Sequence, residues 1–217
     1  MFSRLFAIAF LAFSLPATGQ HTCACASIPA EAFRPDCSVR RLSNGGALYY
    51  QYTCDSIWLT LENRTGRRMV LYSMPSSLHE AHERVGYQLA REFKTVLLFR
   101  NDWVSPTGWN YVVVDKSNGT IKKNGLNVVE CAGAETLGAY LAEFAGSRTL
   151  VLYNPDTGKR IRLPLRRSDL PAEDPQKAIV GLRLKNRILT VTIERAYGNV
   201  SSIQEKTLRF DLRKYGG

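Results

Sequence analysis

The stretch from Val151 to Leu165, VLYNPDTGKRIRLPL, contains a Gly-Lys step of the kind that binds phosphate groups. A phosphate-binding loop needs a first glycine, four intervening residues, Gly-Lys and then Ser or Thr, followed by a helix. Here Tyr153 stands at the first position, Arg160 at the last, and a strand-like alternation follows. The turns NRTG and KSNG have a similar composition, so all three predict hairpin bends with positive φ at Gly66, Gly119 and Gly158.

The segment HEAHE places His79 and His82 three residues apart, where they could ligate a metal ion. The zinc-protease motif spaces its histidines four apart, and no third ligand accompanies this pair. The chain has no Gly-x-Ser-x-Gly elbow, and a buried or disulfide-bonded Cys131 fits its surroundings better than a nucleophile paired with His82. The sequence therefore indicates no metal, no other cofactor and no catalytic residue, and it favours a protein that is not an enzyme.

Cations follow three of the predicted turns, and they form the remaining set of residues with a common chemistry. If the turns project from one side, these cations make a positive rim, and the aromatic residues of a long insertion supply apolar anchors beside it. The alternative is a scattered set of solvated cations that discourage pairing between strand edges. The residues predicted to bind a partner are Arg64, Arg67, Arg68, Trp103, Trp109, Tyr111, Lys122, Lys123, Lys159, Arg160 and Arg162.

Five cysteines, an odd number, lie beyond the N-terminal apolar segment: Cys23, Cys25, Cys37, Cys54 and Cys131. In an oxidising compartment we expect disulfides, with one cysteine left free or bonded to another chain. Cys37 is expected to pair with Cys23 or Cys25, and Cys54 with Cys131 is a further candidate pair. The spacing of the first two cysteines is too close for a zinc knuckle, and the sequence alone does not fix the connectivity.

The elements that must position these residues recur as about four similar units, at residues 47–73, 86–124, 136–165 and 177–212. Each unit has an apolar strand, a bend, a very apolar strand, a turn with glycine and a more basic return strand. The return strands alternate apolar and polar residues, which indicates one buried face, whereas the middle strands are continuously apolar and should be covered on both faces.

This recurrence predicts an all-β fold of repeated antiparallel meander units, resembling a small or incomplete β-propeller, with a β-sandwich as the alternative. Residues 75–86 carry helix signals, and residues 165–177 read as a linker. Residues 132–144 could form a helix by propensity, but their place in the repeat predicts a strand.

The first 19 residues have the layout of a cleaved secretory signal peptide: an early cation, an apolar core from Leu5 to Leu15, and small residues before a cut after Gly19. We expect a Cys-rich N-terminal arm at residues 20–45 and a single all-β repeat domain at residues 46–217. No later stretch is long and apolar enough to cross a membrane. The mature protein is therefore expected to be secreted or periplasmic.

The formal charge of +10 favours anionic partners. Nucleic acid is not expected, because the chain contains no recognisable recognition module. The leading hypothesis is an exported, non-catalytic binding protein that engages an acidic protein partner, as an inhibitor or immunity protein does. The alternatives are a glycan-binding module or an enzyme acting on cell-surface polysaccharide, and an envelope component cross-linked through the arm cysteines.

Overall fold

The computed structural model of the chain describes residues 23, 25, 36–77, 86–101, 110–146, 148–170, 177–196 and 203–216. The predicted signal peptide, most of the predicted arm and the HEAHE segment lie outside the described residues. Within the described ranges the chain is all-β, with 14 strands in four antiparallel sheets of three or four strands. The prediction of an all-β fold built from about four meander units is therefore confirmed.

The first two sheets follow chain order, and each strand pairs with the next one along the chain. The first sheet contains β1 (Arg40–Arg41), β2 (Ala47–Tyr52), β3 (Ser56–Glu62) and β4 (Arg68–Pro75). The second sheet contains β5 (Tyr87–Glu92), β6 (Val96–Asn101), β7 (Asn110–Asp115) and β8 (Ile121–Leu126).

The last two sheets have three strands each, also in chain order. They contain β9 (Leu141–Ala145), β10 (Thr149–Tyr153), β11 (Arg160–Pro164), then β12 (Ile179–Lys185), β13 (Ile188–Ala196) and β14 (Ile203–Asp211). Short 3₁₀ helices lie between or after the strands: η1 (Ala134–Leu137), η2 (Arg167–Asp169) and η3 (Leu212–Tyr215).

Two sequence-based boundaries need correction. The third unit was predicted to begin with a strand over residues 136–145, but η1 occupies its start and β9 begins only at Leu141. Gly133 and Gly138 have φ of 80° and 60°, so the backbone turns instead of extending. The predicted linker at 165–177 includes η2, whose Asp169 is buried and accepts a 2.6 Å bond from Lys206 Nζ.

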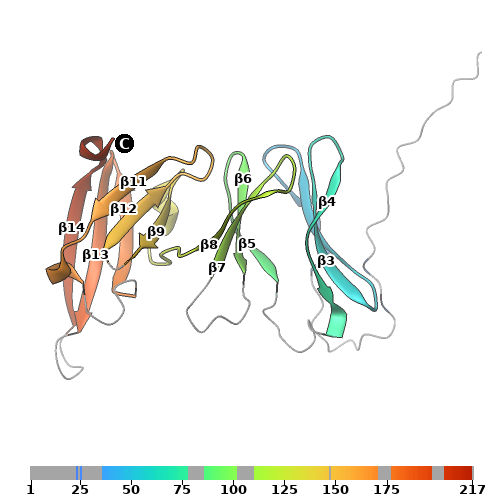
Figure 1. Cartoon of the computed structure of the whole chain (residues 1–217), viewed down its shortest axis with the longest axis horizontal. Coiled ribbons are helices and arrows are strands. Elements are labelled where there is room, and N and C mark those ends of the chain that lie inside the picture. The colour runs from blue at the N-terminus through green and yellow to red at the C-terminus, as the bar shows by residue number, and fades with distance from the viewer. Residues whose placement is uncertain are drawn as a thin grey trace, which may run out of the picture.

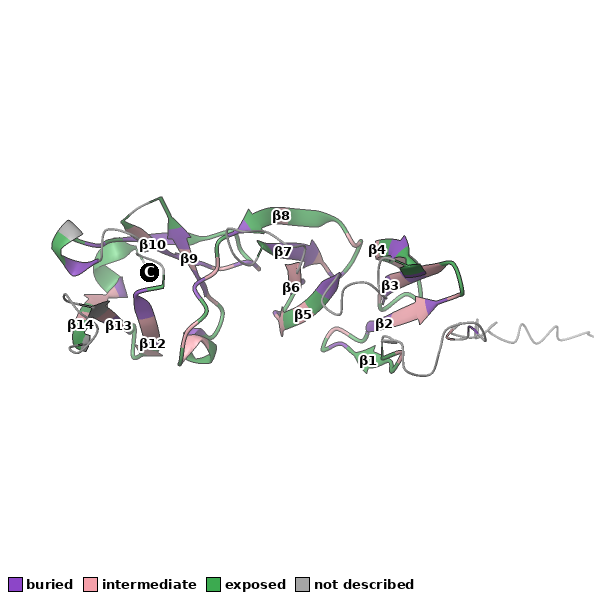
Figure 2. Ribbon diagram, turned by 90° about the horizontal axis from the view of Figure 1, so that it is seen from below, coloured by how far each residue is buried: buried purple, intermediate pink, exposed green. Residues whose placement is uncertain are grey.

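The four sheets stack face to face in a row, as Figures 1 and 2 show from two directions. One core joins Leu59 and Leu61 of the first sheet to Val112 and Val114 of the second. The other face of the second sheet packs against the third, and the third packs against β13 of the fourth. Each neighbouring pair of sheets therefore packs face to face over a shared core, an arrangement that is compatible with both the predicted propeller-like fold and the alternative sandwich.

The position of a strand within the stack explains its composition. Residues Val96 to Phe99 of β6 are at most 3% exposed, because both faces of this strand are covered. The return strand β11 alternates exposed and buried residues, as period-2 patterning predicts. Figure 2 shows β8, at the edge of the second sheet, as largely exposed.

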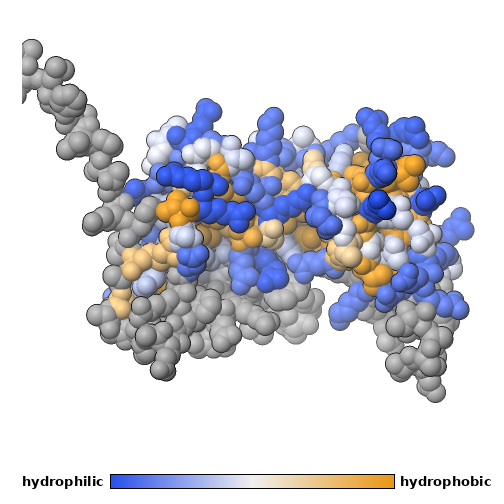
Figure 3. All heavy atoms as spheres, turned by 180° about the vertical axis from the view of Figure 1, so that it is seen from behind, coloured by the Kyte–Doolittle hydropathy of each residue, from blue (hydrophilic) through white to orange (hydrophobic). Residues whose placement is uncertain are grey.

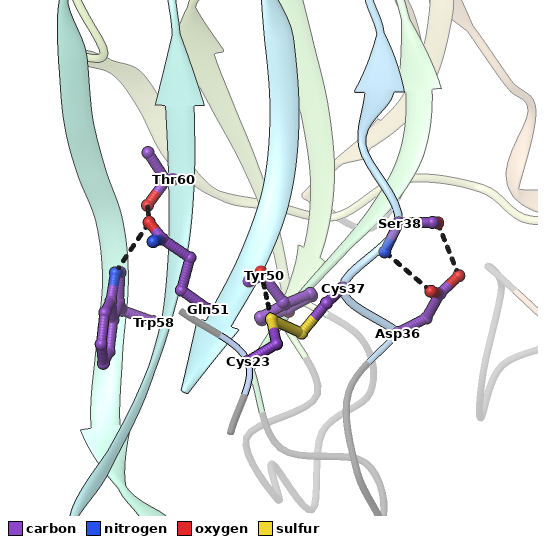
Figure 4. The surroundings of a disulfide bond; sticks show 8 residues. All are labelled: Cys23, Asp36, Cys37, Ser38, Tyr50, Gln51, Trp58 and Thr60. Carbon is purple, nitrogen blue, oxygen red and sulfur yellow. Dashed lines mark hydrogen bonds between the residues drawn. A yellow bond between two sulfur atoms is a disulfide. The ribbon is translucent and has the colours of Figure 1, made fainter. Parts of the chain in front are cut away.

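Among the described residues two disulfides form: Cys23–Cys37, which closes a loop within the N-terminal arm, and Cys25–Cys54, which attaches the arm to the β2–β3 turn of the first sheet. The first pair is one of the two expected and lies beside Tyr50 and the start of β1 (Figure 4). The candidate pair of Cys54 with Cys131 is wrong, and Cys131 is a free thiol. Cys54 lies in the first sheet and Cys131 packs against the core of the last two, so the second sheet separates them.

Candidate functional site

Three hairpin turns share one local design, which the sequence motifs NRTG, KSNG and NPDTG encode. At the start of each turn, an Asn or Asp side chain (Asn63, Asp115 or Asn154) accepts a hydrogen bond from the backbone two residues later; Asn63 Oδ1, for example, accepts from Thr65 N at 3.0 Å. Each ends with a glycine in the left-handed region, with φ of 81° at Gly66, 71° at Gly119 and 76° at Gly158. The sequence prediction of structural hairpin glycines is therefore confirmed.

These turns, together with the β5–β6 turn, lie along one edge of the stack, which we call the hairpin edge: residues 63–67, 93–95, 115–120 and 154–159 (Figure 1, top). Neighbouring turns bond to each other across the sheets. Asn63 Nδ2 donates to Ser117 O at 2.8 Å, and Asp156 Oδ1 accepts from Thr95 N at 2.6 Å. The edge is consequently a connected row rather than a set of independent loops.

A buried lysine stands at the centre of the hairpin edge. Lys116 is 1% exposed, and its ammonium lies 2.6 Å from Glu92 Oε1 and 3.1 Å from Ser43 Oγ. Ser43 also donates from its backbone N–H to the same carboxylate at 2.7 Å. Because a buried cation is costly unless it is paired and hydrogen-bonded, this cluster fixes the first and second sheets in one arrangement.

The carboxylates of the hairpin edge, Asp115 and Asp156, are hydrogen-bonded to other residues of the protein. Burial disfavours ionised Asp115, but hydrogen bonds from Ser117 and the ammonium of Lys122 outweigh it and lower its pKa to about 2. Burial likewise opposes ionisation of Asp156, and the bonds from Thr95 outweigh it, so the pKa of Asp156 is also lowered. Both side chains are thus anionic at neutral pH and point at partners within the protein.

Several cations of the same edge point to solvent instead. Arg64, Arg67 and Lys159 of the predicted set are exposed, and they have no side-chain hydrogen bond or ion pair to the described part of the chain. Lys94 joins them from the β5–β6 turn and was not predicted, although its place in the bend of the second unit was visible in the sequence. The described atoms along this edge are mostly hydrophilic in the space-filling view (Figure 3).

Four strand-borne cations of the predicted set have structural partners. Arg68 Nε lies 3.1 Å from Glu62, and Lys122 Nζ lies 2.9 Å from Asp115. Lys123 bonds Glu143 at 2.9 Å, and Arg160 approaches that carboxylate at 3.7 Å. Both cations also lie over the Tyr153 ring, at 4.9 and 5.3 Å from its centroid. Arg162 is exposed on β11.

The predicted aromatic anchors do not gather beside these cations within the described structure. The prediction that Tyr111 is a surface anchor is wrong. Tyr111 is 2% exposed and packs between the second and third sheets, because its position on β7 faces that core. Trp103 and Trp109 lie outside the described residues. The strand ends that flank them, at Asn101 and Asn110, lie at the edge of the second sheet opposite the hairpin edge (Figure 1).

Trp58 is an exposed-face aromatic residue of the first sheet that is not among the predicted anchors. It lies half-buried on the first sheet, and its Nε1 donates to Gln51 at 3.1 Å. Thr60 donates to the same amide oxygen at 2.9 Å, so the cross-strand position of Gln51 orders both side chains (Figure 4). The alternation of SIWLTLE placed Trp58 on the face opposite the apolar core, and that was the available signal.

The free thiol opens onto a cavity of about 410 Å³ between the second sheet and the third unit, lined in part by Arg91, Tyr111 and Glu135. Burial, and then the charge of Glu135, raise the pKa of Cys131 to about 11. The thiol is therefore protonated at neutral pH and is a poor nucleophile. Among the described residues no three His, Cys, Asp or Glu side chains gather in a way that could hold a metal ion.

In the part of the chain that the structure describes, no helix has the length and apolar character needed to cross a bilayer. Comparison with protein-family models and with curated protein sequences finds no match to this chain.

Proposed function

We propose that this chain is an exported binding protein that holds an acidic protein partner against its hairpin edge, in the manner of an inhibitor or immunity protein. The observation that carries the proposal is the asymmetry of charge along this edge. Its carboxylates are bonded inside the structure, whereas Arg64, Arg67, Lys94 and Lys159 extend into solvent. A surface of this kind attracts an anionic partner and speeds its association.

The rigidity of the edge also supports a binding role. The turns are tied to each other by Asn63, Asp156 and the buried Lys116 cluster, so the cations project from a fixed base. A preorganised surface loses less conformational entropy on binding than flexible loops do. Export is supported by the layout of residues 1–19 and by two disulfides, which persist in oxidising compartments.

Capture from the secreted and periplasmic fractions of the source cells tests the proposal. The edge variant Arg64→Glu, Arg67→Glu, Lys159→Glu is compared with the wild type and with the control Arg40→Glu, Arg41→Glu, Arg148→Glu, which has the same change in net charge at exposed cations outside the hairpin edge. We expect the wild type and the control to retain one acidic protein, and the edge variant to lose it. Equal retention by all three, or capture of only a polysaccharide, contradicts the proposal.

A further inference from the structure

No described element covers the outer face of the last sheet, because the described stack ends there. The core packs against the side of β13 that carries Leu189, Val191 and Ile193, all fully buried. The alternating residues of β13 point the other way, and among them Ile188 is 39% exposed and Thr190 half-exposed. This end of the row therefore presents a sheet face that no other described element covers.

Two arginines flank a threonine on this face. The strand register places Arg183 opposite Thr190 and Thr190 opposite Arg209. Neighbouring strands are about 4.8 Å apart, so the two arginine Cα atoms lie roughly 10 Å from each other across the threonine. An arginine side chain is long enough for both guanidinium groups to lean over the short Thr190 and reach one ligand.

The three residues form part of a shallow concavity of about 280 Å³, lined by Arg183, Lys185, Asn186, Ile188, Thr190 and Arg209. The lining contains three cations, an amide and a hydroxyl, and it contains no carboxylate. None of the three cations has a side-chain ion pair within the described structure. The tight turn that closes one end has positive φ at Asn186 and Arg187, which fixes the ends of β12 and β13.

The acidic residues of this face do not neutralise the concavity. Asp211 is held by Arg213, whose Nε and Nη2 donate to its two oxygens at 2.8 and 2.7 Å. Glu194 and Glu205 face each other at the other end of the sheet, four positions along β13 from Thr190. At about 3.3 Å per residue, that separation is roughly 13 Å. The face is thus basic near the turn and acidic at its far end.

We propose that this concavity binds a tetrahedral oxyanion, a phosphate or sulfate group, between Arg183 and Arg209. The planar guanidinium group matches the oxygens of such an anion in pairs, the Thr190 hydroxyl supplies a further donor, and Lys185 adds a point charge. The site lies on the outer face of the last sheet, apart from the cations of the hairpin edge. It is independent of the proposed function, and either can fail alone.

Calorimetric titration with two probes tests the site: inorganic phosphate, and a size-defined heparin oligosaccharide as sulfate groups on a chain. The variant Arg183→Ser, Arg209→Ser is compared with Arg64→Ser, Arg67→Ser, which loses the same charge from the hairpin edge. We expect at least tenfold weaker binding for the first variant and less than about threefold for the second. Both pairs are exposed, and circular dichroism of each variant checks that the fold is retained.

The two probes distinguish the source of the anion. Binding of phosphate that depends on Arg183 and Arg209 assigns the site to a free ion, and dependence seen only with the oligosaccharide assigns it to a polyanionic chain. Thr190→Val should weaken binding in the same titration, because valine has the shape of threonine but no hydroxyl. Thr190→Ser should keep the wild-type affinity, because serine retains the hydroxyl. Binding of neither probe by the wild type, or equal losses in the two arginine variants, overturns the proposal.

Discussion

Replacing the buried Lys116 should destabilise the protein more than replacing any exposed cation of the hairpin edge. Lys116 is 1% exposed and its partner Glu92 is 19% exposed, with 2.6 Å between their charged atoms. Removing one member of a buried ion pair costs about 3–5 kcal/mol, because the other charge loses its partner. Because Glu92 keeps some contact with solvent, the loss of stability in Lys116→Met should lie at the lower end of this range, about 3 kcal/mol. For a domain of this size, that lowers Tm by roughly 6–12 °C.

Chemical denaturation of four proteins measures this effect: the wild type, Lys116→Met, Glu92→Gln and the double variant. The double variant should be more stable than the sum of the single losses predicts, because neither side chain is left as an unpaired charge. Lys159→Met is the matched control, since this lysine is exposed, and it should change stability by less than about 0.5 kcal/mol. A loss that small for Lys116→Met, or strict additivity in the cycle, would refute the structural role of the cluster.

Three further perturbations follow from the same structure. Replacing Cys25 and Cys54 together by Ser should cost about 2–4 kcal/mol in denaturant unfolding, because their disulfide closes a long loop. Gly133→Ala should destabilise the fold by at least 2 kcal/mol, since its φ is +80° and a Cβ would overlap a backbone carbonyl of β12. The control Gly158→Ala should cost about 1 kcal/mol, because its Cβ would meet no atom and only the positive φ is unfavourable. Asp115 has a lowered pKa of about 2, so its contribution to folding stability is complete above pH 4 and is lost as the pH falls through 2. In the variant Asp115→Asn, Tm should therefore fall less steeply with decreasing pH below 4, which melts at a series of pH values measure.

The repeated fold was predictable from the sequence because its signals are local. Period-2 alternation, continuous apolar strands and the turn glycines Gly66, Gly119 and Gly158 each act over a few residues. The structure keeps nearly all of these strands, including NYVVVD over the full length of β7. The third unit departs from its predicted start, where two glycines with positive φ override the β pattern.

The surface was less predictable, because neighbouring sheets decide what is exposed. Lys116 lies in a polar turn sequence, yet the adjacent Glu92 and Ser43 bury it. Tyr111 is an aromatic residue of the type that anchors binding partners, but the third sheet covers it. The pairing of Cys25 with Cys54 likewise depends on which sheet the arm meets. No short window of sequence contains these contacts between units.

The most direct test of the proposed function is the affinity of the captured acidic partner for the edge variant. Calorimetry at about 50 and 200 mM NaCl, with the purified partner and the wild type, should give binding that weakens with salt, because exposed charges are screened. The variant Arg64→Glu, Arg67→Glu, Lys159→Glu should bind at least 100-fold more weakly, and the control on the other surfaces should bind like the wild type. An edge variant with unchanged affinity, or binding indifferent to salt, would contradict the assignment of the hairpin edge as the binding surface.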